Sequence, residues 1–152
     1  MFHTVQFRNR ILIAEGGPSL DLLNGDAIGA RGGAPRHRVE VQAGYFQNGL
    51  GMRLSANWQS ATRVNEANGD ALRFGAIGTA NLRLFANLGV IPSVVRGRPF
   101  LRGTRLTFAV DNIFNTRQQV TDASGSIPLS FQPDLLDPLG RTVRLQFRKL
   151  FF

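Results

Sequence analysis

Side chains that could perform chemistry are few in this 152-residue sequence, and they form no recognisable group. The absence of cysteine excludes thiol catalysis and thiolate metal sites. The two histidines, His3 and His37, lie far apart in the sequence, so a histidine-rich metal site is not expected. Asp134 and Asp137 are close, but two loop carboxylates without a positioned partner are typical of turns rather than of acid–base catalysis.

The glycine-rich segment and the polar residues before it do not match a catalytic or phosphate-binding motif either. Ser19 and Asp21 are typical of a turn or a helix cap. The glycines do not stand between a strand and a helix with phosphate-loop spacing, so they indicate loop flexibility. These glycines are Gly25, Gly29, Gly32 and Gly33. We therefore predict no catalytic site, no metal and no cofactor, and the protein is not expected to be an enzyme.

The basic residues are almost all arginines, and they are dispersed. The chain has 18 basic and 10 acidic residues, a formal net charge of +8, and Lys149 is its only lysine. The arginines stand mostly singly between apolar residues, whereas a nucleic-acid-binding tail gathers its charge into runs. No aromatic stacking platform is interleaved with them. We therefore expect no nucleic-acid partner, although a soluble basic β protein that binds nucleic acid or another polyanion remains the alternative.

Apolar and polar residues alternate with a period of two, which predicts β-strands. Two connections, residues 14–35 and 116–140, are long, whereas residues 47–51 form a short hairpin link. A turn is predicted at residues 65–70, and a short helical turn is possible at residues 20–24. The fold class is all-β, a single domain over residues 1–152 that forms an antiparallel meander of about six long strands. The predicted strands are residues 2–13, 38–46, 51–62, 72–88, 104–114 and 142–152.

Alternation alone fits a soluble sandwich as well as a transmembrane β-barrel. Strands of about 10 residues match the roughly 9 to 11 that cross a bilayer, whereas soluble strands average about 5 to 6. Aromatic residues near the strand ends fit an interfacial girdle. An arginine facing lipid at mid-bilayer costs about 2 to 4 kcal/mol, so a barrel must turn its arginines inward. The predicted lumen-facing basic residues include Arg53, Arg73, Arg83, Arg105 and Arg144.

The C-terminal third carries a more specific pattern. A strand that ends in Asp111-Asn112-Ile113-Phe114-Asn115 is followed by a long loop, then by Gly140-Arg141 and a last strand that ends in aromatic residues. This combination resembles the carboxyl end of TonB-dependent outer-membrane receptors. The motif residues are Asn112, Phe114, Asn115, Gly140 and Arg141. The resemblance implies an outer-membrane location, with long loops outside the cell and short links in the periplasm.

The last strand also resembles the signal that the barrel-assembly machinery recognises, a terminal aromatic residue preceded by apolar residues at alternate positions. Lys149 occupies a position that is usually apolar, and the chain runs one residue beyond the expected end. The resemblance implies that outer-membrane lipid and the assembly machinery are partners. The signal residues are Val143, Leu145, Phe147, Phe151 and Phe152.

Six strands are fewer than the eight of the smallest single-chain barrels. The chain is therefore expected to be the C-terminal portion of a receptor barrel, a fragment or a truncated gene product without signal peptide or plug. Its partners would be the remaining strands and the plug, with TonB reached only through that plug. The resemblance implies uptake of a scarce nutrient such as a ferric siderophore. A barrel completed by several copies of the chain is a further possibility.

Overall fold

The computed structural model describes residues 1–26, 32–65 and 71–151. They form two compact units, which we describe separately. Unit 1 consists of Met1–Glu40, Asn57–Gly78 and Thr116–Gly140. Unit 2 consists of Val41–Ala56, Thr79–Asn115 and Arg141–Phe152.

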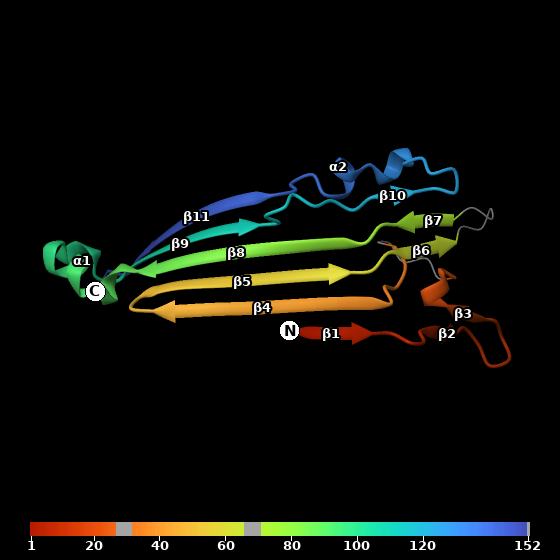
Figure 1. The fold of residues 1–152 in the computed structure, drawn as a ribbon, viewed down its shortest axis with the longest axis horizontal. Helices are drawn as coiled ribbons and strands as arrows, with labels where there is room; N and C mark the ends of the chain where they lie inside the picture. Colours follow the sequence, from red (N-terminus) through yellow and green to blue (C-terminus); the bar gives the residue numbers. More distant parts are fainter. Residues whose placement is uncertain (27–31, 66–70, 152) are drawn as a thin grey trace. The chain divides into compact units, whose positions relative to one another are not determined.

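The structure is mostly antiparallel β-sheet, as predicted. The largest sheet has six strands in the order β1-β4-β5-β8-β9-β11, with β1 and β11 at its edges (Figure 1). Six strands therefore share one sheet, as the alternating pattern indicated. Their bounds are Phe2–Val5 for β1, His37–Gln47 for β4, Leu50–Gln59 for β5, Ile77–Asn87 for β8, Thr104–Asp111 for β9 and Thr142–Lys149 for β11.

Five of the six predicted strands are shorter than the pattern indicated, and two of them, residues 104–114 and 142–152, end at Asp111 and Lys149. Residues 2–13 divide into β1 and β2 (Arg10–Leu12), and β2 pairs with β3 (Ser19–Asp21) as an antiparallel ladder. The opposed Arg10 and Asp21 also form an ion pair of 3.3 Å. Residues 72–88 divide at Gly75, whose N–H donates to the carbonyl of Gln119 at 2.8 Å. Residues 51–62 end as a strand at Gln59. At Gly75 a partner distant in sequence interrupts the alternation.

Unit 1 contains the small sheet β10-β7-β6 and a buried apolar cluster. The cluster consists of Val64, Leu72, Phe74 and Val120, and the ring of Phe131 packs edge-on against Phe74 with centroids 5.7 Å apart. Val120 is completely buried. The elements that carry the cluster are β6 (Thr62–Asn65), β7 (Ala71–Phe74), β10 (Val120–Thr121) and the 3-10 helix η4 (Leu129–Phe131), and helix α2 (Pro133–Leu136) follows.

The connections agree with the sequence in two places and differ in a third. Asn48 and Gly49 have φ of 48° and 83°, which closes β4 and β5 with a two-residue turn suited to the strand twist. The helical turn forms as η1 (Leu22–Asn24), capped by the Asp21 carboxylate, which accepts from the Leu23 N–H at 3.1 Å. Most of the turn predicted at residues 65–70 lies outside the described residues.

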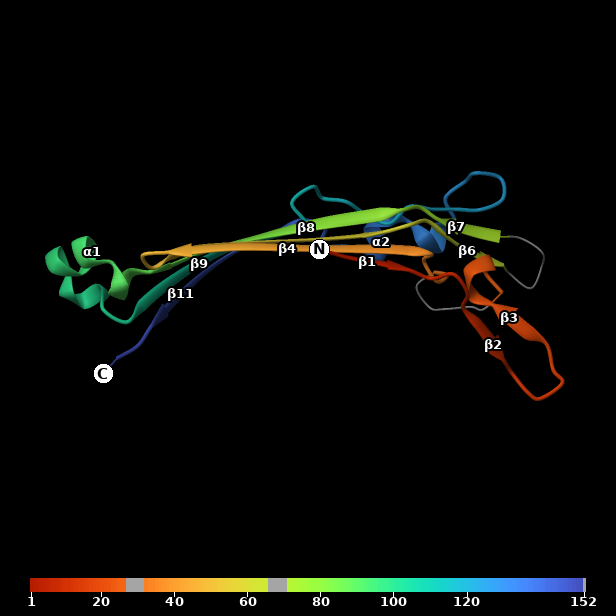
Figure 2. The same cartoon turned by 60° about the horizontal axis from the view of Figure 1, so that its bottom comes forward.

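The connection between β8 and β9 is helical, which the alternating pattern did not indicate. It contains η2 (Leu88–Val90), α1 (Pro92–Gly97) and η3 (Pro99–Leu101). Pro92 and Pro99 stand in the first turns of α1 and η3, where a missing N–H costs nothing. In Figure 2, α1 lies at the end of unit 2 where β8 ends and β9 begins.

Candidate functional site: the two faces of unit 2

The register of three neighbouring strands gives unit 2 two chemically different faces. Strand β9 lies between β8 and β11, and residues directly opposite each other form rows across the sheet. Successive rows point to opposite faces because side chains alternate along each strand. We call the two sides the apolar face and the arginine face. The apolar rows are Leu82-Val110-Val143, Leu84-Phe108-Leu145 and Ala86-Leu106-Phe147, and those of the arginine face are Arg83-Ala109-Arg144, Phe85-Thr107-Gln146 and Asn87-Arg105-Arg148.

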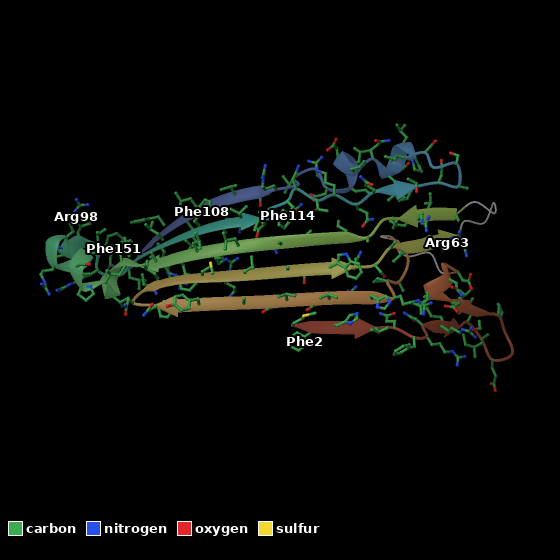
Figure 3. The ribbon with its side chains drawn as sticks, in the orientation of Figure 1. Phe2, Arg63, Arg98, Phe108, Phe114 and Phe151 are labelled. Atoms are coloured by element: carbon green, nitrogen blue, oxygen red, sulfur yellow. The ribbon has the colours of Figure 1, made fainter. Side chains whose placement is uncertain are left out.

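Large side chains on the apolar face are exposed. Phe108, at its centre, is 38% exposed and Leu145 is 74% exposed. Figure 3 shows the Phe108 side chain at β9. A hollow of about 590 Å³ lies on this face. Its lining includes Tyr45, Leu50, Met52, Leu84, Phe108 and Leu145.

The arginine face holds a smaller hollow of about 260 Å³. Ala109 forms part of its floor, and this short side chain leaves space between Arg83 and Arg144, which flank it in one row. The guanidinium of Arg105 stacks over the ring of Phe85 at 4.8 Å from its centroid. The arginines around the hollow are Arg83, Arg105, Arg144 and Arg148, and Arg53 lines a neighbouring hollow with Arg83.

Unit 2 has almost no acidic side chains to balance these arginines. Asp111 is its only carboxylate side chain, and it pairs with Arg144 at 2.8 Å. Within the described part of the chain, Arg83, Arg105 and Arg148 make no ion pair with a carboxylate. The basic residues of unit 2 are Lys149 and nine arginines: Arg53, Arg83, Arg96, Arg98, Arg102, Arg105, Arg141, Arg144 and Arg148.

Arg73 is separated from the other four predicted lumen-facing arginines. It belongs to β7 in unit 1, directly opposite Arg63 of β6, and lines a different hollow beside Asn24 and Thr62. The sequence placed it with Arg83 because residues 72–88 alternate almost continuously. The break at Gly75 separates the two arginines into different sheets.

The motif residues after β9 form a hydrogen-bonded corner. Asn112 and Asn115 have positive φ, 53° and 54°, which asparagine tolerates better than most residues. The Asn115 N–H donates to the Asn112 carbonyl at 2.9 Å, and its side-chain oxygen accepts from the Arg141 N–H at 2.9 Å. The Arg141 side chain also donates to the Ile113 carbonyl at 3.3 Å. The motif therefore joins the end of β9 to the start of β11.

The other two motif residues behave differently. Gly140 has a φ of 54°, and its N–H donates to the side chain of Asp137 at 3.0 Å. Phe114 is exposed and projects from the turn that follows β9 (Figure 3). Asp134 forms an ion pair with Arg117. Both loop carboxylates therefore have structural partners within unit 1.

The predicted assembly residues lie on the edge strand β11 and beyond it. Val143, Leu145 and Phe147 are all exposed on the apolar face. Phe151 follows the end of the strand and is 88% exposed, and Phe152 lies outside the described residues. The described residues of this set are therefore accessible to another protein.

Lys149 has a role that the sequence did not indicate. Its ammonium group donates to the backbone carbonyls of Phe100 and Arg102, and the Leu150 N–H donates to the Gly103 carbonyl at 3.0 Å. These hydrogen bonds connect the end of β11 to the segment after α1. A lone lysine among apolar positions was the only available signal, and its partners lie almost 50 residues away.

The two histidines prove to be neighbours, contrary to their separation in the sequence. Antiparallel pairing of β1 with β4 brings His3 Nε2 within 3.3 Å of His37 Nδ1, and the rings stack 5.5 Å apart. Across residues 1–26, 32–65 and 71–151, no cluster of three or more metal-ligating side chains occurs. Ser19 lies in β3 rather than at a cap.

One loop carboxylate of unit 1 has a shifted pKa. The hydroxyl of Ser124 donates to Asp122 at 2.6 Å, and the N–H groups of Ser124 and Ser126 donate at 2.9 and 3.0 Å. These hydrogen bonds stabilise the charged form and hold the pKa of Asp122 below its ordinary value, with the Ser124 hydroxyl contributing most.

Comparison with known proteins returns no match for this chain among family models, curated proteins or solved structures. Among the described residues, no helix is both long enough and apolar enough to cross a membrane.

Proposed function

We propose that the chain forms part of the wall of an outer-membrane β-barrel of the TonB-dependent receptor type. The observation that carries the proposal is the alternation of apolar and arginine-bearing rows across β8, β9 and β11. In a barrel wall, apolar rows contact lipid and polar rows face the lumen. The sheet of unit 2 has this arrangement in three successive rows on each face.

The exposure of the apolar face supports a lipid environment. Soluble monomers rarely expose contiguous apolar patches larger than a few hundred Å². Phe108 and Leu145 lie in the central apolar row, and both stay accessible although they are surrounded by apolar neighbours. Acyl chains would cover such a face without any change in the fold.

The charge distribution supports the same orientation. Arg83, Arg105 and Arg148 extend from rows that alternate with the apolar ones. Burial of an unpaired arginine in lipid costs about 2 to 4 kcal/mol at mid-bilayer, so these side chains require a polar lumen. In the proposed receptor, this lumen also holds the plug, through which TonB acts.

The edges of the sheet define what else the barrel requires. Strands β1 and β11 each have one unpaired side, and a bilayer does not tolerate open sheet edges. Both edges must therefore be paired in the assembled wall, by the remaining strands of the receptor or, where the isolated chain inserts, by further copies of it. The exposed apolar residues of β11 fit recognition by the assembly machinery, and the complete receptor would take up a scarce nutrient such as a ferric siderophore.

A second candidate is a soluble β protein that binds a polyanion. The hollow between Arg83 and Arg144 favours it, since its four arginines have a single carboxylate beside them, Asp111 on Arg144, and such a cluster attracts anionic groups. This candidate leaves the apolar face in water. The barrel proposal requires the apolar face to contact lipid, whereas the soluble alternative requires it to remain in water.

A pair of adjacent substitutions on β11 tests the proposal. Leu145→Arg places a charge in the middle of the apolar face, and Gln146→Arg places the same charge on the arginine face. The full chain and both variants are refolded with phosphatidylcholine vesicles, and the protease-protected β-structured fraction is measured. We expect Leu145→Arg to weaken insertion by about 2 to 4 kcal/mol and Gln146→Arg to have little effect.

Equal effects of the two substitutions would contradict the assignment of the faces. A monodisperse, folded protein that ignores the vesicles would overturn the membrane proposal and favour the soluble polyanion-binding protein.

A further inference from the structure

The helical connection between β8 and β9 forms an exposed surface that combines arginines with apolar side chains. Val90 is 61% exposed and Phe100 is 68% exposed, although both are large apolar residues. Phe151, beyond the end of β11, lies at the same end of unit 2 (Figure 3). The exposed basic side chains of this connection are Arg96, Arg98 and Arg102.

This surface has an ordered backbone. The Arg98 N–H donates to the Val94 carbonyl at 3.1 Å, which ends α1, and the Arg102 N–H donates to the Pro99 carbonyl at 3.1 Å. Lys149 fixes the segment to β11 through two carbonyls. The three arginines are therefore presented from a fixed scaffold, while the ammonium group of Lys149 is already used.

No carboxylate side chain is available near these arginines in the sequence of unit 2. There is no acidic residue from residue 71 to residue 110, in the hairpin of residues 41–56, or after Asp137. The only acidic side chain of the unit, Asp111, pairs with Arg144 at the opposite end of the β9–β11 ladder from Lys149. An anionic partner for these arginines would therefore come from outside the unit.

The connection begins beside the β4–β5 hairpin, which borders the apolar face. Tyr45 and Leu50, at the β4–β5 hairpin, line the large apolar hollow, and the Asn87 N–H donates to the Gly49 carbonyl at 2.7 Å where β8 enters the helical connection. Exposed aromatic side chains together with arginines at strand ends are typical of the membrane–water interface. An apolar face that ends in a basic rim fits a bilayer with anionic headgroups.

We propose that the connection, through Arg96, Arg98 and Arg102, binds the phosphodiester groups of anionic lipid headgroups and fixes the depth of the sheet in the bilayer. This inference rests on the proposed function, because the apolar face must lie in the same bilayer. Guanidinium groups bind phosphate oxygens with two parallel hydrogen bonds, which suits arginine better than lysine. Val90, Phe100 and Phe151 enter the interface beside them.

The test compares two triple variants with the same change in charge. The first is Arg96→Gln/Arg98→Gln/Arg102→Gln on the helical connection. The control, Arg83→Gln/Arg105→Gln/Arg148→Gln, removes three arginines from the arginine face. Full chains that have the same circular dichroism spectrum are floated with phosphatidylcholine vesicles, with and without phosphatidylglycerol.

Each basic residue at an anionic membrane surface raises partitioning about five-fold. We expect the first triple variant to lose roughly 100-fold in affinity for the anionic vesicles and to bind zwitterionic vesicles as the unmodified chain does. The control variant should retain most of its preference for anionic vesicles. A parallel flotation with excess inorganic phosphate at constant ionic strength should leave binding intact.

The outcomes separate the inference from the proposed function. Equal losses in both triple variants would show attraction by net charge alone and would overturn the headgroup site. Displacement by inorganic phosphate would overturn the lipid as ligand. Failure of every chain to enter zwitterionic vesicles would contradict the barrel wall, whereas a selective loss in the first variant would still support the headgroup site.

Discussion

Unit 1 and unit 2 use their apolar residues in opposite ways. In unit 1, Phe74 is only 6% exposed and packs with Val64, Leu72 and Val120 into a core. In unit 2, the described residues that are buried are small or polar, and Phe108 remains accessible on one side of a sheet. Unit 1 therefore gains stability from its own interior, whereas unit 2 depends on what covers its faces.

The two units also differ in how far their charged side chains are balanced within the unit. Asp111 is the only acidic side chain of unit 2, and all other acidic residues belong to unit 1. Unit 1 can pair its charges internally, as in Arg10–Asp21 and Arg117–Asp134. One chain therefore combines a region with its own apolar core and paired charges with a region whose apolar side chains and arginines remain exposed.

The largest expected effect tests the core of unit 1. Phe74→Ala removes a buried ring that contacts Phe131 edge-on, so we expect a loss of about 3 to 5 kcal/mol in the free energy of unfolding of this unit. Hydrogen exchange at the amides of β6, β7 and β10 measures it.

Phe108→Ala is the matched substitution in unit 2. Its ring lies on an exposed face, so the change should lower stability in water much less than Phe74→Ala and should instead weaken insertion into vesicles. Equal losses in water for both variants would remove the distinction between a self-sufficient and a dependent unit.

A smaller effect is expected at the corner after β9. Asn115→Ala removes the acceptor of the Arg141 N–H and places alanine at a φ of 54°, which together should cost about 1 to 2 kcal/mol. The measurement is thermal unfolding of unit 2 in detergent. Asn115→Gly tolerates the backbone and loses only the hydrogen bond, so it should be the milder change; a harsher Gly variant would contradict this account.

Lys149→Met tests whether the hydrogen bonds of Lys149 hold the helical connection against the end of β11. Methionine fits the apolar position but leaves the carbonyls of Phe100 and Arg102 without their charged donor. Because the site is partly accessible to water, we expect a loss of only about 1 kcal/mol. The local signal is faster amide exchange at Leu101 and Arg102, and unchanged exchange would show that the lysine does not hold this segment.

The smallest effect concerns pH and belongs to unit 1. The folded pKa of Asp122 is lowered, so its contribution is present above the ordinary carboxylate pKa and is lost as the pH falls through the lowered value. We expect the Ser124 and Ser126 amides to lose protection at acidic pH. In Asp122→Asn this pH dependence should be absent, and its persistence would point to another group.

The strands were predictable because alternation reports local exposure to two environments. Several positions at which strands end were not, because they depend on a partner distant in the sequence. The N–H of Gly75 donates to the Gln119 carbonyl, which interrupts the strand and separates Arg73 from Arg83. The neighbouring pair of His3 and His37 was missed for the same reason.

The site was only partly visible in the sequence. Arg53, Arg83, Arg105 and Arg144 were predicted to share a face, and unit 2 brings them to one side of its sheet. The helical connection was not foreseen, because a mixture of proline, arginine and apolar residues has no simple period.

The alternating rows of unit 2 also limit how its strands can change in length. Removing or adding one residue in the middle of β9 would turn half of that strand over, so that Arg105 would exchange sides with Leu106 or Thr104. A change of two residues would preserve the faces and shift only the pairing partners. Insertions and deletions in these strands should therefore be tolerated in pairs.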